Sequence, residues 1–111
     1  MTSGGEAEQL AFDYLRRHGL TAVERNYRCR FGEIDLIMRD GQTLVFVEVR
    51  MRASNAFGGA PESIDARKQR KLLATARHYM GAQGRIPVCR FDVVLLNGDS
   101  RIQWIPNAFG E

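Results

Sequence analysis

Apolar residues recur along the chain at spacings that predict two helices and five strands in the order αβββαββ. Helical spacing covers residues 5–18, with Gly19 as a stop. A second helix is expected from the cap residue Ser63 to about Met80, ended by Gly81. The expected strands are residues 22–30, 33–38, 44–49, 88–96 and 102–105. Because the second helix can return the chain for a parallel pairing, this order predicts an α/β sandwich around a mixed sheet.

The second and third expected strands form a hairpin that carries two acidic residues. Asp40-Gly41 separates their apolar runs, and this dipeptide is typical of a two-residue turn. With that turn, Asp35 lies opposite Phe46 and diagonal to Glu48 on the same face, about 7–8 Å away at Cα. A register slip of one residue would place the two carboxylates on opposite faces, so this interpretation depends on the turn.

Two carboxylates that share a buried face call for a cation. Glu48 lies within the apolar run 44–49, where like charges repel and an unpaired carboxylate is costly. A bound Mg²⁺ or Mn²⁺ removes both costs, because hard cations take carboxylate oxygens and keep positions open for water and phosphate. The alternative is that Glu48 pairs with Arg50 or Arg39 on an exposed face of the sheet.

Positive charge gathers at the start of the second expected helix. The chain has a net charge of +3, which favours an anionic partner without requiring one. Four cations crowd this helix start: Arg67, Lys68, Arg70 and Lys71. Together with Arg52, at the beginning of the glycine-containing loop 52–62, they are candidates for contacts to nucleic-acid phosphates. The alternative for the helix cations is an ordinary solvated face.

Other features of the sequence narrow the choice of class. We expect a single domain over residues 1–111, and no apolar run approaches the ~20 residues that cross a membrane, which favours a cytoplasmic protein. Cys29 and Cys89 fit no zinc or redox spacing and are expected to be free thiols. Asp92 is expected in a structural salt bridge and Trp104 in the core. No serine–histidine–aspartate set or phosphate-binding glycine loop offers a competing mechanism.

The hairpin and several short segments resemble known proteins. The run 32–37 followed by 45–50 resembles the PD-(D/E)xK nuclease signature. More narrowly, the chain resembles the YraN-type family of small bacterial proteins, which are similar to archaeal Holliday junction resolvases. Besides the hairpin, the matching segments are residues 5–6, 26–28, 68–70, 90–94 and 107–109.

This resemblance implies a restriction-endonuclease-like fold and assigns roles to matching residues. Asp35 matches the metal-binding aspartate of the motif, and Glu48 matches its second acidic ligand. Glu6 matches an acidic residue that related resolvases supply from their first helix. Gln69 matches a polar position that some members of the superfamily direct at the site. Arg50 stands where the motif usually has lysine.

Two of these residues have structural alternatives. Ser3 and Glu6 fit a capping box at the start of the first helix. Gln69 falls within the apolar stripe of the second helix, where its amide would need hydrogen-bond partners in the core or could direct a metal-bound water.

Together these observations predict a metal-dependent endonuclease that hydrolyses nucleic-acid phosphodiesters, with branched DNA as the substrate class. A homodimer is expected by analogy with resolvases. Arg50 cannot act as a base, because guanidinium keeps its proton, but it can stabilise negative charge on the phosphate. One alternative is a non-catalytic nucleic-acid-binding module on a nuclease scaffold. Another is a protein-interaction domain in which the acidic pair has no catalytic role.

Overall fold

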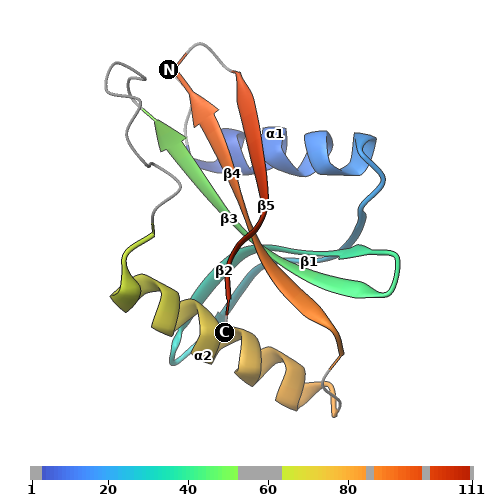
Figure 1. Cartoon of the computed structure of the whole chain (residues 1–111), viewed down its shortest axis with the longest axis vertical. Coiled ribbons are helices and arrows are strands. Elements are labelled where there is room, and N and C mark those ends of the chain that lie inside the picture. Colours follow the sequence, from blue (N-terminus) through green and yellow to red (C-terminus); the bar gives the residue numbers. More distant parts are fainter. Residues whose placement is uncertain (1–3, 53–63, 85–86, 99–100, 111) are drawn as a thin grey trace.

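The computed structural model describes residues 4–52, 64–84, 87–98 and 101–110 of the chain (Figure 1). Two helices and five strands follow one another in the predicted order αβββαββ. The helices are α1 (Gly4–Arg17) and α2 (Ala66–Ala82), and the strands are β1 (Thr21–Cys29), β2 (Gly32–Asp40), β3 (Thr43–Arg52), β4 (Cys89–Asn97) and β5 (Ile102–Phe109). None of the helices in these ranges is both long and apolar enough to span a bilayer.

The five strands form one mixed sheet in the order β1-β2-β3-β4-β5. Only the central pair β3–β4 is parallel, and α2 supplies the crossover between these two strands. The neighbouring pairs are antiparallel. The sequence-based expectation of a mixed sheet is therefore confirmed.

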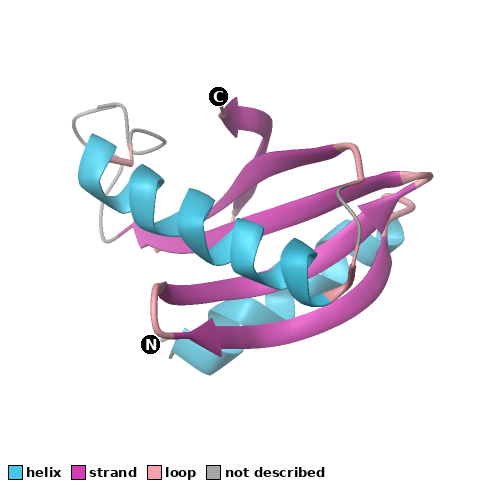
Figure 2. Ribbon diagram, turned by 90° about the horizontal axis from the view of Figure 1, so that it is seen from below, coloured by secondary structure: helices cyan, strands magenta, loops and turns pink. Residues whose placement is uncertain are grey.

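A helix covers each face of this sheet (Figure 2). On the α2 side, Ile37, Phe46 and Val93 pack with apolar residues of the helix. On the α1 side, Leu15 of the helix and Trp104 of β5 join a second apolar cluster, as predicted for the tryptophan. The two helices bury opposite faces of the same strands, so β2 and β3 lie between α1 and α2.

The start of α2 differs from the prediction. Asp65 is the N-cap, and its carboxylate accepts a hydrogen bond from the backbone N–H of Lys68 at 2.8 Å. The choice of Ser63 was wrong because a second cap-forming side chain follows two residues later; Ser63 itself lies outside the described residues. At the other end the helix passes Gly81 and ends at Ala82, since the following backbone still bonds to the last-turn carbonyls.

The β2–β3 turn is also displaced from its predicted place. Asp40 pairs with Thr43, so the two turn residues are Gly41 and Gln42 rather than Asp40 and Gly41. Gly41 adopts a φ of 61°, a conformation that glycine enters without strain. The register therefore differs from the expected one by two residues. Because side chains alternate with a period of two, the paired segments 36–40 and 43–47 keep their predicted faces. Beyond the last pair the prediction was wrong, since Ile34, expected on the face of Leu36, packs with Ile37 on the α2 side.

The sheet divides beyond the middle of this hairpin. Pairing between β2 and β3 stops at Leu36↔Val47. The pairing of β2 with β1 continues to Gly32, and the pairing of β3 with β4 continues to Arg52. Figure 1 shows the beginning of β2 and the end of β3 turning away from each other. We call the opening between them the fork; it begins at residues 36 and 47.

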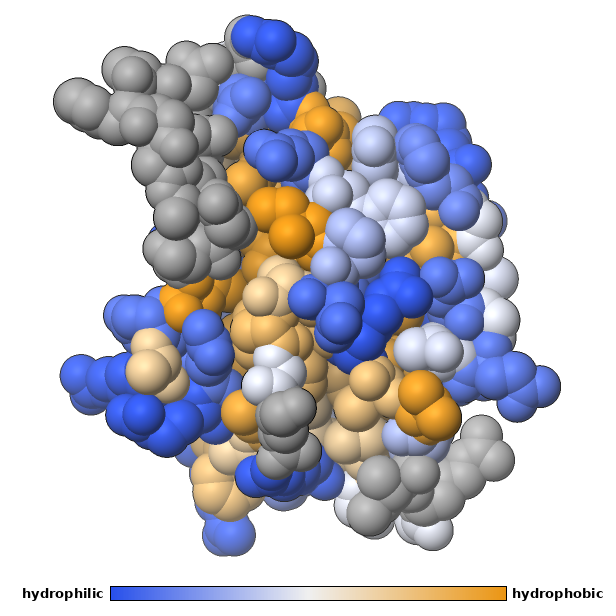
Figure 3. Space-filling view, viewed as in Figure 1, coloured by the Kyte–Doolittle hydropathy of each residue, from blue (hydrophilic) through white to orange (hydrophobic). Residues whose placement is uncertain are grey.

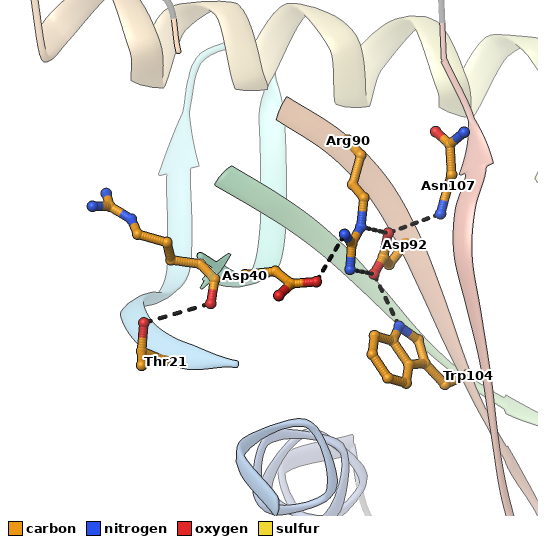
Figure 4. Close-up of polar contacts among 7 residues, drawn as sticks. Thr21, Asp40, Arg90, Asp92, Trp104 and Asn107 are labelled. Atoms are coloured by element: carbon orange, nitrogen blue, oxygen red, sulfur yellow. Dashed lines mark hydrogen bonds and ion pairs between the residues drawn. The ribbon is translucent and has the colours of Figure 1, made fainter. Parts of the chain in front are cut away.

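Asp92 in β4 is the centre of a buried polar network (Figure 4). Its side chain is fully buried and accepts hydrogen bonds from Arg90 at 3.0 and 3.2 Å. The indole N–H of Trp104 and the backbone N–H of Asn107 each donate to it at 2.9 Å. Arg90 also reaches Asp40 at 3.0 Å, next to the hairpin turn. These bonds link β4, β5 and the β2–β3 hairpin, which confirms a structural salt bridge for Asp92.

Replacing Asp92 by alanine is expected to lower the free energy of unfolding by about 3–5 kcal/mol, because the Arg90 guanidinium loses a buried partner. Urea denaturation measures the loss. Asp40→Ala is the matched control, since it removes an exposed partner of the same guanidinium and should cost at most about 1 kcal/mol. A similar, small loss for both variants would contradict a structural role for Asp92.

Candidate active site

Asp35 lies at the fork, and its carboxylate is tied to the neighbouring strand. The Oδ2 atom accepts a hydrogen bond from the backbone N–H of Val49 at 2.9 Å. Val49 lies two residues beyond the last pair of the β2–β3 ladder, so the side chain takes the place of a strand carbonyl as acceptor. This bond brings Asp35 to the level of Glu48. The prediction that Asp35 lies opposite Phe46 was wrong, because Ile37 holds that position.

Glu48 is buried, with 8% of its surface exposed, and it faces α2. Its Oε2 atom lies 2.9 Å from Nζ of Lys68, in the first turn of that helix. The side chain of Lys68 is half exposed, so the ammonium reaches from solvent into the fork. The cation next to Glu48 thus comes from the helix, whereas the alternative interpretation had named Arg39 or Arg50 of the sheet.

A third carboxylate, from Glu8 of α1, lies close to the side chain of Asp35 and acts on it electrostatically. Sequence reasoning had assigned the helix carboxylate to Glu6, which the structure leaves exposed. At 100° per residue, Glu8 lies two turns before the buried Leu15 and on its side of the helix, whereas Glu6 lies on the opposite side. That spacing was the signal that could have identified Glu8.

The electrostatics of Asp35 reflect this crowding. Burial, together with the negative charges of Glu48 and Glu8, raises the pKa of its carboxyl group from 3.8 to about 7. The hydrogen bond from Val49 lowers the pKa but does not compensate. The fork therefore concentrates negative charge, and perturbed groups of this kind are characteristic of functional sites.

The other two predicted catalytic residues lie differently. Gln69 is partly buried, and its Nε2 donates to the carbonyl of Ile64 at 2.6 Å. This bond fits the structural alternative for Gln69, since it engages the amide nitrogen with the main chain at the start of α2. Arg50 is half buried on β3, two residues after Glu48 and therefore on the same face of the strand.

The predicted phosphate-binding cations of α2 lie in the first turns of that helix. Arg67, Arg70 and Lys71 are exposed on the first turns of the helix, next to Lys68. Figure 3 shows hydrophilic surface over this end of α2, at the lower left of the view. The backbone of Arg52 ends β3, and its side chain lies outside the described residues. Among the described helix cations, Lys68 contacts a site carboxylate, and Arg67, Arg70 and Lys71 are its exposed neighbours on the same helix.

The oxygen donors at the fork fit a hard divalent cation in their chemistry. Carboxylate oxygens are the ligands that Mg²⁺ and Mn²⁺ take. Within the described ranges, no group of three or more His, Cys, Asp or Glu side chains is arranged to hold a metal by itself. Asp35 and Glu48 would therefore share a cation with backbone or water oxygens, and Lys68 would have to yield part of its contact with Glu48.

The raised pKa of Asp35 makes a prediction about stability. The folded protein holds a proton on this group more tightly than the unfolded chain does, so its contribution to stability falls as pH rises from about 4 to about 7. Asp35→Asn keeps an acceptor for Val49 and removes the charge. We expect this variant to be more stable than the wild type by about 2 kcal/mol at pH 8, with a difference near zero at pH 4.

Urea denaturation of both proteins at several pH values measures this difference. Glu33→Gln is the control, because Glu33 is an exposed carboxylate on the same strand. A difference that does not change with pH would show that the Asp35 carboxyl group is not perturbed by folding.

Comparison with solved structures identifies the fold. The chain is similar to Hjc of Archaeoglobus fulgidus, a Holliday junction resolvase from an archaeal hyperthermophile, with a TM-score of 0.58 and 20% identity. The match covers 89% of this chain and 72% of Hjc. At this identity the likeness concerns the fold, and it confirms the restriction-endonuclease-like class.

Comparison of sequences identifies the family. A UPF0102 protein of Nitrosomonas europaea is 59% identical over 111 residues, covering 97% of this chain and 93% of the relative. A UPF0102 protein of Cupriavidus taiwanensis is 56% identical over 108 residues, covering 96% of this chain and 81% of the relative. The model of the uncharacterised protein family UPF0102 matches residues 7–96. The chain therefore belongs to UPF0102, the YraN-type family that its motifs resemble.

Proposed function

We propose that this protein is a metal-dependent endonuclease that hydrolyses nucleic-acid phosphodiesters, and that branched DNA is its substrate class. The observation that carries the proposal is the convergence of Asp35 and Glu48 at the fork, with the ammonium of Lys68 against Glu48. The fold supports it, because the similar protein Hjc is a Holliday junction resolvase. A homodimer, with paired sites facing two strands, stays a prediction from the same resemblance.

Each group at the fork has a role in this reaction. Asp35 and Glu48 would hold Mg²⁺ or Mn²⁺, which when bound polarises a phosphate and acidifies a water ligand. The hydrogen bond from Val49 fixes the orientation of the Asp35 carboxylate before substrate arrives. Lys68 and Arg50 present positive charge toward the reacting phosphate, where it stabilises the charge that develops during attack. The remaining α2 cations hold the flanking backbone.

A second candidate is a nucleic-acid-binding module without cleavage. The observation in its favour is that Arg50 replaces the motif lysine and that Lys68 is engaged with Glu48 in an ion pair of 2.9 Å. Such a pair supplies positive charge to Glu48 without a metal. Salt-sensitive binding of DNA with no cleavage in Mg²⁺ or Mn²⁺ would favour this candidate.

Loss of either carboxylate tests the nuclease. We expect Asp35→Ala and Glu48→Ala each to reduce cleavage of a four-way DNA junction in Mn²⁺ by about 100-fold or more, because each removes a proposed metal ligand. Gel assays with labelled junctions measure the rate, and isothermal titration of Mn²⁺ measures metal binding separately. Glu33→Ala is the matched control on β2. Equal rates for the wild type and both site variants would rule out this site.

Lys68 is expected to affect the rate, and its neighbour Arg67 only the binding. Lys68→Ala should lower the cleavage rate at saturating DNA about 100-fold, since it removes a cation that touches Glu48. Arg67→Ala removes an exposed cation of the same helix turn and should weaken DNA binding a few-fold with little change in that rate. Single-turnover kinetics separate the two effects. Identical behaviour of the two variants would reduce Lys68 to a phosphate contact.

A further inference from the structure

The turn between β1 and β2 presents an aromatic ring to solvent. Phe31 is 40% exposed, although large apolar side chains in this fold are mostly buried. Five large apolar residues are exposed within the described ranges, and Phe31 is the only aromatic one among them. The ring lies at the turn that leads into β2, the strand that carries Asp35.

The surroundings of Phe31 combine a cation with an aromatic support. The guanidinium of Arg30 lies over the ring, 4.9 Å from its centroid. The imidazole of His78, from α2, meets the ring at 5.9 Å and 62°. His78 is itself held by the hydroxyl of Tyr27 at 2.6 Å from Nδ1. The ring is thus supported from the α2 side while part of its surface remains open.

The backbone fixes this turn against α2. Gly32 has a φ of 153°, and a Cβ atom there would lie 3.0 Å from the hydroxyl oxygen of Thr75. Thr75 is buried, and its hydroxyl donates to the carbonyl of Lys71 at 2.8 Å, so it cannot easily move aside. The close approach of Gly32 therefore holds the neighbouring Phe31 in place, which reduces the entropy that a ligand would lose on binding.

Charge near the turn favours an anionic ligand. Arg28 is balanced by Glu33 at 3.5 Å, so the cation left beside the ring is Arg30. A flat apolar surface beside the guanidinium of Arg30 fits one chemical class well: a nucleic-acid base with its phosphate.

We propose that Phe31 and Arg30 form a stacking site for an unpaired base of the bound nucleic acid. Bases inside a duplex have both faces covered, so a protein ring stacks only on a base at a branch, an end or a single strand. Phe31 precedes Asp35 by four residues of strand, a distance of ~13 Å or about four steps of stacked DNA. The turn would thereby place a branch point at a fixed distance from the fork. This inference rests on the proposed binding of nucleic acid, although not on its cleavage.

The test uses fluorescence of 2-aminopurine placed at the branch of a four-way junction, in EDTA and low salt. We expect the wild type to change that fluorescence, and Phe31→Ala to weaken binding of the junction and of single strands about 10-fold. Affinity for an unbranched duplex should change less than twofold. Phe31→Trp should restore the change in 2-aminopurine fluorescence and the affinity for junctions and single strands. Val23→Ala, which truncates another exposed apolar residue on β1, is the control.

The outcomes separate this inference from the nuclease proposal. If the protein cleaves junctions and Phe31→Ala changes neither the cleavage rate nor the affinity, the stacking site is overturned and the nuclease proposal stands. Binding that depends on Phe31 without any cleavage in Mn²⁺ would keep the stacking site and overturn the nuclease. Equal weakening of duplex and single-strand binding, or no binding of any of these DNAs, would also overturn the stacking site. Thermal unfolding by circular dichroism confirms that each variant is folded.

Discussion

The hydrogen bond between the Val49 N–H and the Asp35 carboxylate is the interaction on which the site depends. Where β2 and β3 part, backbone donors lose their ladder partners, and an unpaired donor away from water is costly. Asp35 supplies the missing acceptor, so the same bond satisfies the sheet and fixes a carboxylate. Asp35 is held in a buried position close to Glu48 and Glu8, and burial together with these two charges raises its pKa although the bond itself lowers it. The fold thus keeps like charges together that would otherwise separate.

Two acidic residues of this sheet show how surroundings decide between structure and function. Asp92 is fully buried but receives hydrogen bonds from a guanidinium, an indole and a backbone N–H, so its charge is compensated within the protein. Asp35 receives one backbone bond and faces two further carboxylates. The first arrangement stabilises the fold. In the second, Lys68 compensates Glu48, whereas the Asp35 carboxyl group has its pKa raised, as is common for groups at functional sites.

The sequence was sufficient for the elements and their order, because these follow from local periodicity. The error of two residues in the hairpin register left the faces of the paired segments unchanged, since the face of a strand repeats every two residues. Beyond the last pair the alternation fails at Ile34, and the metal-binding roles of Asp35 and Glu48 stay a prediction. Prediction failed where helices meet the sheet. Motif similarity favoured Glu6, whereas packing of α1 through Leu15 turns Glu8 toward Asp35. The contact of Lys68 with Glu48 depends on where α2 crosses the sheet, which no local pattern records.

The position of Lys68 changes the role that is expected of Arg50 in the proposed site. If the motif lysine is needed chiefly for its charge, its place on the strand matters less than its distance from Glu48, the second acidic residue of the motif. Lys68 meets that condition from another element, with its nitrogen 2.9 Å from Glu48. Arg50 is then free to act as a permanent cation for the phosphate, a role that suits the planar, always charged guanidinium better than proton transfer. In this arrangement Arg50 of the sheet and Lys68 of α2 together supply the positive charge of the site. The full set of charged groups therefore depends on how α2 packs against the sheet, rather than on the hairpin sequence alone.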